Sequence, residues 1–206
     1  VVASPIMLIA ALCVKLYDGG PVFYFQERLT IGGKPFKICK FRSMCVDSEK
    51  HGARLASKHD SRITPVGKVL RNLHLDELPQ LFNVFKGDMS LVGPRPERQT
   101  IMREYRRELP EFYYRLKVKA GLTGYAQVYG KYNTTPYDKL KLDLFYIENY
   151  SFFLDLKLLL MTVKIFFQKE VSEGVDDNQV NALKDSVEEI TGEDLHHGRT
   201  ENRESK

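Results

Sequence analysis

Two adjacent carboxylates, Asp76 and Glu77, lie in the sequence between two arginines, Arg71 and Arg95. Arg95 stands between two prolines in the segment 93–96, and these prolines restrict the backbone on both sides of it. Arginines commonly bind phosphate groups, and a carboxylate can attack phosphorus only where cations offset the repulsion between the negative charges. The pattern therefore favours chemistry at a phosphate group.

The two carboxylates allow different roles in such chemistry. One could act as a nucleophile and form an acyl phosphate. Its neighbour could hold Mg²⁺, which takes oxygen ligands and bridges phosphate oxygens. An Asp-Glu pair also has an ordinary explanation, because acidic residues at the start of a helix complement the helix dipole. The surrounding arginines favour the functional interpretation.

A second pair of cations, Lys40 and Arg42, ends the run that begins at Phe36. If this run is a strand, its period of two places both cations on one face, side by side. Phosphate binding and a solvated strand face explain such a pair equally well. Both residues are therefore candidates for phosphate binding, and the alternative stays open.

The first elements that must position these residues follow from local patterns. The runs 22–25 and 36–42 are rich in residues that favour strands, and the turn at Gly32-Gly33 between them predicts a β-hairpin. After a polar stretch, Thr64 and Pro65 supply an N-cap and a first-turn proline. An apolar stripe at helical spacing follows them and predicts a helix.

The carboxylates come directly before a second helical stripe. This stripe begins at Leu78 and ends at a predicted C-cap, Gly87, so Asp76 is expected at or near a helix N-terminus. A short strand is predicted over 89–92 and a charged helix over 97–109. The strand leads directly into the proline-flanked arginine, which is thereby held in place.

The C-terminal half predicts one more strand and two more helices. The turn 121–124 leads into a predicted strand over 125–128, a helix opens at Thr135-Pro136, and another runs over 151–168. The last helix is strongly apolar but carries lysines, so a core helix and a helix in the membrane interface explain it equally well. Beyond about residue 170 the composition predicts a disordered tail.

Length and charge narrow the protein class. The 206 residues suffice for one domain with a sizeable core, and the net charge of +4 fits an anionic membrane, a phosphate-bearing substrate or nucleic acid. The basic residues are dispersed without a recognised nucleic-acid motif, so nucleic acid is not an expected partner. The three cysteines have no zinc or disulfide spacing, which favours a reducing, cytosolic environment.

The apolar run over 1–14 is shorter than the roughly 20 residues that span a bilayer. The chain opens within this run, so we expect the sequence to be a segment of a longer protein. Ser4 and Pro5 can be an N-cap and first-turn proline, or a break in a helix that enters the bilayer and turns back.

Three segments carry a resemblance to a known family. They are Lys-Phe-Arg-Ser-Met at 40–44, Leu-Asp-Glu-Leu-Pro-Gln-Leu-Phe-Asn-Val at 75–84, and Lys-Gly-Asp-Met-Ser-Leu-Val-Gly-Pro-Arg-Pro at 86–96. In this order they resemble the bacterial sugar transferases, the monotopic polyprenyl-phosphate phosphoglycosyl transferases. The similarity extends from Ser4 to about Lys169.

The resemblance implies an enzyme that transfers a sugar 1-phosphate from a UDP-sugar to polyprenyl (undecaprenyl) phosphate and releases UMP. By this similarity Asp76 is the nucleophile, Glu77 helps to bind the Mg²⁺ cofactor, and Arg71 and Arg95 contact phosphates. The expected location is the cytoplasmic face of the bacterial cell membrane. The segment 124–133 resembles members that serve capsule or exopolysaccharide pathways, with glucose or galactose 1-phosphate as a first expectation.

Two further positions gain a meaning from the resemblance. The family's membrane element is a re-entrant helix broken at Ser-Pro, which matches Ser4-Pro5 and makes the lipid bilayer an expected partner. Lys119 stands where many members have arginine, and as a phosphate-binding residue it lacks an arginine's bidentate grip.

We therefore expect an α+β fold that is mainly helical, with a short β-hairpin or small sheet and a membrane-associated N-terminal helix segment. The expected divisions are 1–17 for the second half of the re-entrant helix, 18–170 for the catalytic domain and 171–206 for the tail. Two alternatives remain: a Mg²⁺-dependent phosphodiesterase and a non-catalytic peripheral membrane scaffold. The oligomeric state stays open, homo-oligomers included.

Overall fold

The first strands form the β-hairpin that the sequence predicts. In the computed structural model, which describes residues 3–46, 48, 60–130 and 134–166, strands β1 (Phe23–Leu29) and β2 (Pro35–Phe41) pair antiparallel. The short 3-10 helix η1 (Ile31–Gly33) joins them, and Gly32 and Gly33 have φ values of 67° and 76° there. Glycine adopts this left-handed conformation without steric cost, which explains the tight reversal.

Helices make up most of the remaining described structure. The α-helices are α1 (Ser4–Asp18), α2 (Pro65–Asn72), α3 (Gln80–Lys86), α4 (Gln99–Glu108), α5 (Tyr125–Tyr129), α6 (Pro136–Asn149) and α7 (Phe152–Phe166). The other elements are the 3-10 helices η2 (Leu75–Glu77) and η3 (Pro110–Lys117) and the strands β3 (Ser90–Val92) and β4 (Gly121–Thr123). The fold is therefore α+β and mainly helical, as expected. All these elements belong to one unit, formed by residues 1–48 and 62–172.

Local capping signals placed three helix ends correctly. The Thr64 hydroxyl accepts a hydrogen bond from the Gly67 amide at 2.9 Å and caps α2. The Thr135 hydroxyl caps α6 in the same way, through the Asp138 amide at 3.1 Å. Gly87 ends α3 with a φ of 84°. These ends depend on residues close in sequence, which is why the pattern alone predicts them.

The predicted strand over 125–128 is wrong, because these residues form helix α5. The strand is instead β4, immediately before them, and it pairs parallel with β3 through Ser90–Gly121 and Val92–Thr123. A Cβ on Gly124 would lie 2.1 Å from the Gly93 carbonyl oxygen. The glycines of 121–124 thus serve a close approach of two backbones rather than a turn.

Helix α1 begins one residue earlier than the N-cap prediction implies. Ala3 occupies the N-cap position, and Ser4 and Pro5 lie within the first turn. Ala10 and Val14 are buried on the side that faces α2 and β2, while the opposite side exposes apolar residues such as Leu12 and Leu16. No described helix is both long enough and apolar enough to cross a membrane. The re-entrant break at Ser4-Pro5 stays a prediction.

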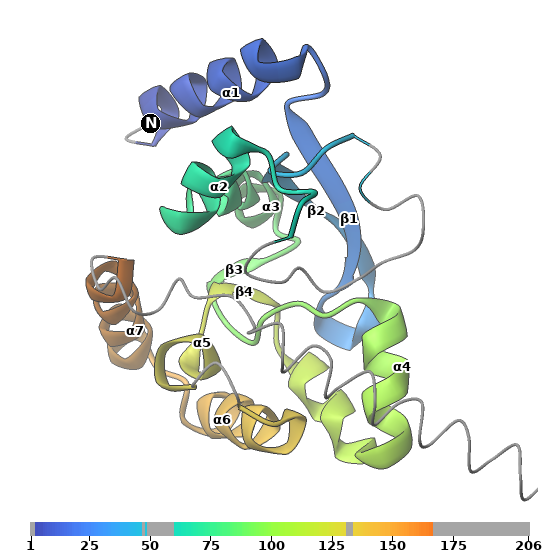
Figure 1. Cartoon of the computed structure of the whole chain (residues 1–206). Helices are drawn as coiled ribbons and strands as arrows, with labels where there is room; N and C mark the ends of the chain where they lie inside the picture. The colour runs from blue at the N-terminus through green and yellow to red at the C-terminus, as the bar shows by residue number, and fades with distance from the viewer. Residues whose placement is uncertain (1–2, 47, 49–59, 131–133, 167–206) are drawn as a thin grey trace, which may run out of the picture. The chain divides into compact units, whose positions relative to one another are not determined.

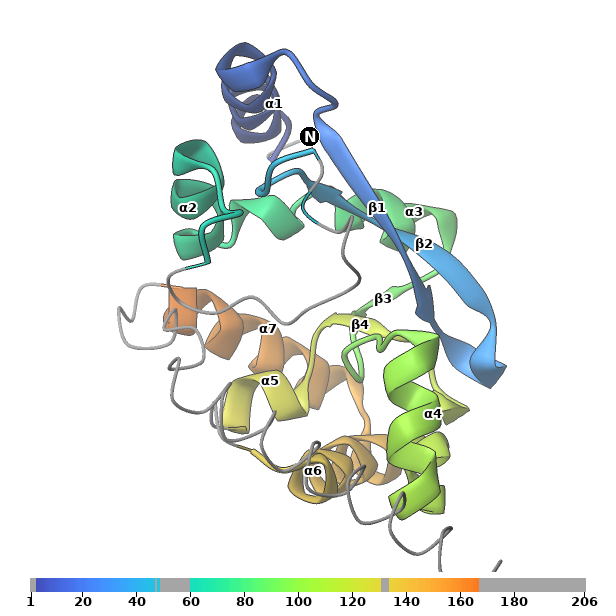
Figure 2. The same cartoon turned by 45° about the vertical axis from the view of Figure 1, so that its right-hand side comes forward.

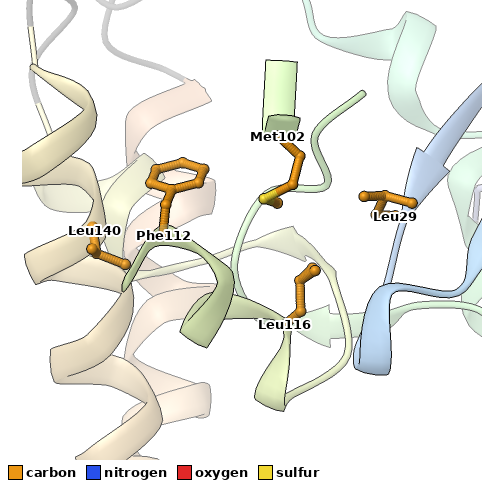
Figure 3. Close-up of a cluster of buried hydrophobic side chains, with 5 residues drawn as sticks. All are labelled: Leu29, Met102, Phe112, Leu116 and Leu140. Carbon is orange, nitrogen blue, oxygen red and sulfur yellow. The ribbon is translucent and has the colours of Figure 1, made fainter. Parts of the chain in front are cut away.

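The hairpin connects two groups of helices. Figures 1 and 2 both show β1 and β2 extending from the end where α1 and α2 lie to the end where α4 lies. At the α4 end a buried cluster joins four elements, with its side chains converging in Figure 3. Its members are Leu29, Met102, Phe112, Leu116 and Leu140.

Helix α7 contributes to the core, one of the two explanations that the sequence left open, and its place in a membrane interface stays a prediction. Leu158 is fully buried and packs with Val92 and Tyr146, so one edge of the helix belongs to the core. Phe152 and Phe153 remain 76% and 80% exposed. The polar stretch over 49–59 and the tail from 167 onward lie outside the described residues.

Candidate active site

The carboxylate pair lies in η2, the single 3-10 turn between α2 and α3. His74, with a φ of 52°, ends the preceding helical segment in a left-handed conformation and reverses the chain into η2. η2 packs against both α2 and β2. Asp76 and Glu77 thus lie in a helical first turn, as predicted, and Pro79 after them occupies the N-cap position of α3.

Glu77 is held by two cations from distant parts of the sequence. The Lys40 Nζ donates to Glu77 Oε1 at 2.7 Å, and Arg95 Nη2 donates to the same oxygen at 2.8 Å. Arg95 Nη1 reaches the other oxygen, Oε2, only at 3.5 Å. The structure therefore brings together three of the predicted site residues, one each from β2, η2 and the proline-flanked segment.

Asp76 has a different environment from its neighbour. The residue is 8% exposed, and within the described part of the chain no hydrogen bond or ion pair engages its carboxylate. Burial and the adjacent Glu77 charge raise the Asp76 pKa, while the charges of Lys40 and Arg71 lower it in part. A buried carboxylate with free lone pairs is suited to act as a nucleophile.

The same cations act more strongly on Glu77. Burial alone would raise the Glu77 pKa, but the charges and hydrogen bonds of Arg95 and Lys40 outweigh this and lower the pKa well below its usual range. Burial lowers the Lys40 pKa, and the Glu77 charge opposes that change. Glu77 is therefore ionised throughout the neutral range and fixed in position.

Arg71 and Arg95 both lie near the carboxylates, but their contacts and locations differ. Arg71 lies in the last turn of α2, near enough to Asp76 for its charge to lower the Asp76 pKa. The Arg95 side chain is 44% exposed although it contacts Glu77. Two guanidinium groups near the carboxylates suit the binding of a phosphate.

Arg42 does not join this group, contrary to its predicted place beside Lys40. Its guanidinium is 7% exposed and bonds both carboxylate oxygens of Asp18, with Nη1 at 2.6 Å from Oδ2. The Arg42 Nε also donates to the Pro21 carbonyl at 2.6 Å. The reason is that the turn after α1 brings Asp18 within reach of Arg42, so this arginine ties α1 to the hairpin.

Lys119 lies beside a cleft of about 430 Å³ between β3 and α7. The cleft is lined mainly by apolar side chains, Leu91 and Phe152 among them, together with Asp155. Asp76 and Glu77 do not line it. The structure therefore does not place Lys119 with the carboxylate pair.

The donor set of the site fits one kind of metal ion. Within the described residues no three His, Cys, Asp or Glu side chains gather as a metal cage. Mg²⁺, however, is usually bound by one or two carboxylates together with substrate phosphates and water. Among the described residues, Glu77 Oε2 has only the long contact to Arg95. This oxygen suits Mg²⁺ that arrives with a diphosphate.

Sequence reasoning missed one residue that builds the site. The Asn83 side chain accepts from the Cys39 amide at 3.0 Å and donates to the Lys37 carbonyl at 2.8 Å. It thereby joins α3 to β2 at two residues that precede Lys40 along the strand. The available signal was a lone polar residue within the apolar run 81–85, since a buried amide must find hydrogen-bond partners.

Comparison with known proteins identifies the family of this chain. The model of the bacterial sugar transferase family matches residues 1–169. The chain is 48% identical over 164 residues to the UDP-N-acetylgalactosamine-undecaprenyl-phosphate N-acetylgalactosaminephosphotransferase of Aeromonas hydrophila, covering 78% of this chain and 39% of that protein. It is 44% identical over 168 residues to the UDP-glucose:undecaprenyl-phosphate glucose-1-phosphate transferase of Klebsiella pneumoniae, covering 79% and 36%.

A shorter relative matches over most of its length. The uncharacterized sugar transferase EpsL of Bacillus subtilis is 42% identical over 180 residues, which cover 87% of this chain and 85% of that protein. The chain spans less than half the length of the Aeromonas and Klebsiella proteins. The family match covers the hairpin, the carboxylate pair and the proline-flanked arginine, and the chain belongs to the bacterial sugar transferase family.

Proposed function

We propose that this chain is the catalytic part of an enzyme that transfers a sugar 1-phosphate from a UDP-sugar to undecaprenyl phosphate. The observation that carries the proposal is the buried Asp76 carboxylate, unpaired among the described residues, beside a Glu77 fixed by two cations. The names of the Aeromonas and Klebsiella relatives support the reaction class. Because those names specify different sugars, the sugar of this chain is not assigned.

In the first step, an Asp76 oxygen attacks the phosphorus that carries the sugar. A new bond forms between that oxygen and phosphorus, and the bond from phosphorus to the bridging oxygen of the diphosphate breaks. The electron pair of the broken bond leaves with UMP. The ionised Asp76 carboxylate has no proton to lose, so the step needs no general base. Asp76 then carries the sugar phosphate as an acyl phosphate.

In the second step, an oxygen of undecaprenyl phosphate attacks the same phosphorus. The acyl phosphate bond breaks and returns its electron pair to the Asp76 carboxylate. The product is a lipid diphosphate that carries the sugar, and the enzyme is regenerated. Both displacements occur at the same phosphorus atom, so both substrates must reach the same carboxylate. This requirement favours a shallow site that is open to a membrane surface.

The cations lower the cost of bringing anions together. Arg95 and Arg71 lie near the carboxylates and would bind the phosphates of the substrate, while Lys40 holds Glu77 in place. Mg²⁺ held by Glu77 would neutralise charge that develops on the diphosphate. We assign the reaction to the cytoplasmic face of the bacterial membrane and to the start of capsule or exopolysaccharide assembly.

The test is trapping of the intermediate. The full-length protein in vesicles is incubated with Mg²⁺ and either UDP-glucose or UDP-N-acetylgalactosamine, without lipid acceptor, and its intact mass is measured. We expect a sugar-phosphate adduct that Asp76→Asn abolishes and that Glu108→Gln, at an exposed position of α4, retains. Free sugar phosphate without an adduct would instead indicate a phosphodiesterase, and vesicle binding without turnover a scaffold.

A further inference from the structure

Arg115 of η3 is a buried cation that the proposed reaction does not use directly. Its Nε donates to Asp143 Oδ2 at 2.9 Å, its Nη2 lies 2.7 Å from the same oxygen, and both side chains are 1% exposed. Its Nη1 lies 3.4 Å from Glu97 Oε1. Two carboxylates therefore fix the plane of this guanidinium, because its fork of donors has a rigid geometry.

One further hydrogen bond connects Arg115 with the active site. Its Nη2 donates to the backbone carbonyl of Arg95 at 3.0 Å. The Arg95 side chain, in turn, contacts Glu77. The buried guanidinium thus holds the backbone of the residue whose own guanidinium faces the carboxylate pair.

The segment around Arg95 depends on such contacts to its carbonyls. Pro94 and Pro96 have no N–H group, so their backbones can form hydrogen bonds only through their carbonyl groups. The Gly121 amide donates to the Pro94 carbonyl at 3.0 Å, and Arg28 Nη1 donates to the Pro96 carbonyl at 3.2 Å. Arg115 supplies the corresponding contact for the central residue of the segment.

The core explains why Arg115 can hold its position. Phe112 and Leu116, on either side of it in η3, belong to the buried cluster of Figure 3. The Arg115 guanidinium also lies over the Phe112 ring, 4.8 Å from its centroid. A shift of Arg115 would require this cluster to repack, so the cluster and the ion pairs together form a rigid support.

We propose that Arg115 is a positioning residue for the transfer reaction. With Asp143 and Glu97 it fixes the Arg95 backbone, and it thereby sets the Arg95 guanidinium against Glu77 and the phosphates of the substrate. This inference rests on the proposed function, since it takes Arg95 to contact those phosphates. Small displacements of a group that binds the transition state are costly, about 100-fold in rate for roughly 1 Å.

The first part of the test uses two matched variants. Arg115→Lys keeps the charge but cannot hold Asp143 and the Arg95 carbonyl in one planar fork. Lys139→Met removes another cation that is paired with Glu97, and the described hydrogen bond of Lys139 reaches the Glu97 side chain and not the Arg95 backbone. We expect Arg115→Lys to lower kcat for UMP release by about tenfold to 100-fold, with a smaller change in KM. Lys139→Met should keep the kcat per folded molecule.

The second part is a double-mutant cycle with Arg95→Gln. If Arg115 acts through Arg95, Arg115→Lys costs little further activity once Arg95 is replaced. Additive losses, or equal losses in Arg115→Lys and Lys139→Met, would overturn the inference. If Arg115→Lys does not fold, Asp143→Asn takes its place in the same cycle. No UMP release from the unchanged protein would overturn the proposed function as well, whereas additivity overturns the inference alone.

Discussion

Asp76 and Glu77 are neighbours in sequence, yet their carboxyl groups have opposite environments. Lys40 and Arg95 lower the Glu77 pKa, whereas burial and the charge of Glu77 raise the Asp76 pKa. Environments that separate the pKa values of two carboxylates commonly give them separate roles. Here Glu77 gains a fixed charge and Asp76 keeps its lone pairs free.

The raised pKa of Asp76 predicts that this residue lowers the stability of the folded protein. A buried carboxylate with a raised pKa destabilises the folded state once the pH is above its unfolded-state pKa, because ionisation is less favourable in the folded protein. Asp76→Asn removes that charge. We expect it to raise the free energy of unfolding by about 1 kcal/mol at pH 7, while transfer falls to background. Urea unfolding measures the first effect and UMP release the second; a less stable variant would contradict the argument.

Lys40 should control the pH dependence of transfer. The nucleophile must be ionised, so the rate falls as the pH drops through the Asp76 pKa, which lies above the ordinary value of 3.8. The Lys40 charge lowers this pKa, and Lys40→Met should therefore shift the acidic limb of the rate profile to higher pH. Lys37→Met, at an exposed position of the same strand, is the control and should leave the limb in place. An unmoved limb in Lys40→Met would exclude Asp76 as the titrating group.

At the scale of elements, prediction succeeded where structure depends on local sequence. The hairpin turn and the caps at Thr64, Thr135 and Gly87 involve residues close in the chain. Strand β4 was misplaced because it is stabilised by pairing with β3 some thirty residues away, as the partners Ser90 and Gly121 show. Parallel pairing leaves no turn signal next to the strand.

The same distinction between local and long-range determinants applies to the residues of the candidate site. The sequence identified Asp76, Glu77 and Arg95 because their types and spacing carry the chemistry. It did not identify Arg115, and it placed Arg42 wrongly, because each pairs with a carboxylate more than twenty residues away in the chain. The sequence gives the type of each charged residue but not its ion-pair partner, because long-range packing decides which opposite charge lies beside it.

The pair of Asp18 and Arg42 gives a prediction for the docking of α1. The hydrogen bond from Arg42 lowers the Asp18 pKa from 3.8 to about 2. The folded-state pKa is thus below the unfolded value, so the pair contributes stability above about pH 4 that is lost as the pH falls toward 2. Asp18→Asn should therefore lower stability at pH 6 and have little effect near pH 2. Urea titrations at the two pH values measure the difference, and an equal effect at both would contradict the assignment.

At the scale of the whole molecule, exposed apolar side chains remain to be explained. On α1, Leu12 is 51% and Leu16 82% exposed, and α7 exposes Phe152 and Phe153. Contiguous apolar surface on a protein commonly marks a contact with membrane or protein. Undecaprenyl phosphate, the proposed acceptor, resides in a bilayer, so we propose that the exposed side of α1 contacts the membrane interface.

This assignment predicts that α1 contributes directly to membrane binding. The double substitution Leu12→Gln and Leu16→Gln removes apolar surface without changing charge, and burial of a leucine side chain contributes roughly 1.5 to 3 kcal/mol. We therefore expect at least about a tenfold weaker affinity for phosphatidylglycerol vesicles, measured by co-sedimentation of the full-length protein. Tyr137→Gln, at a position of α6 that is 55% exposed, should bind like the unchanged protein. Equal binding by the α1 variant would place the membrane contact elsewhere, whereas weaker binding by this variant alone would support α1 as a membrane contact.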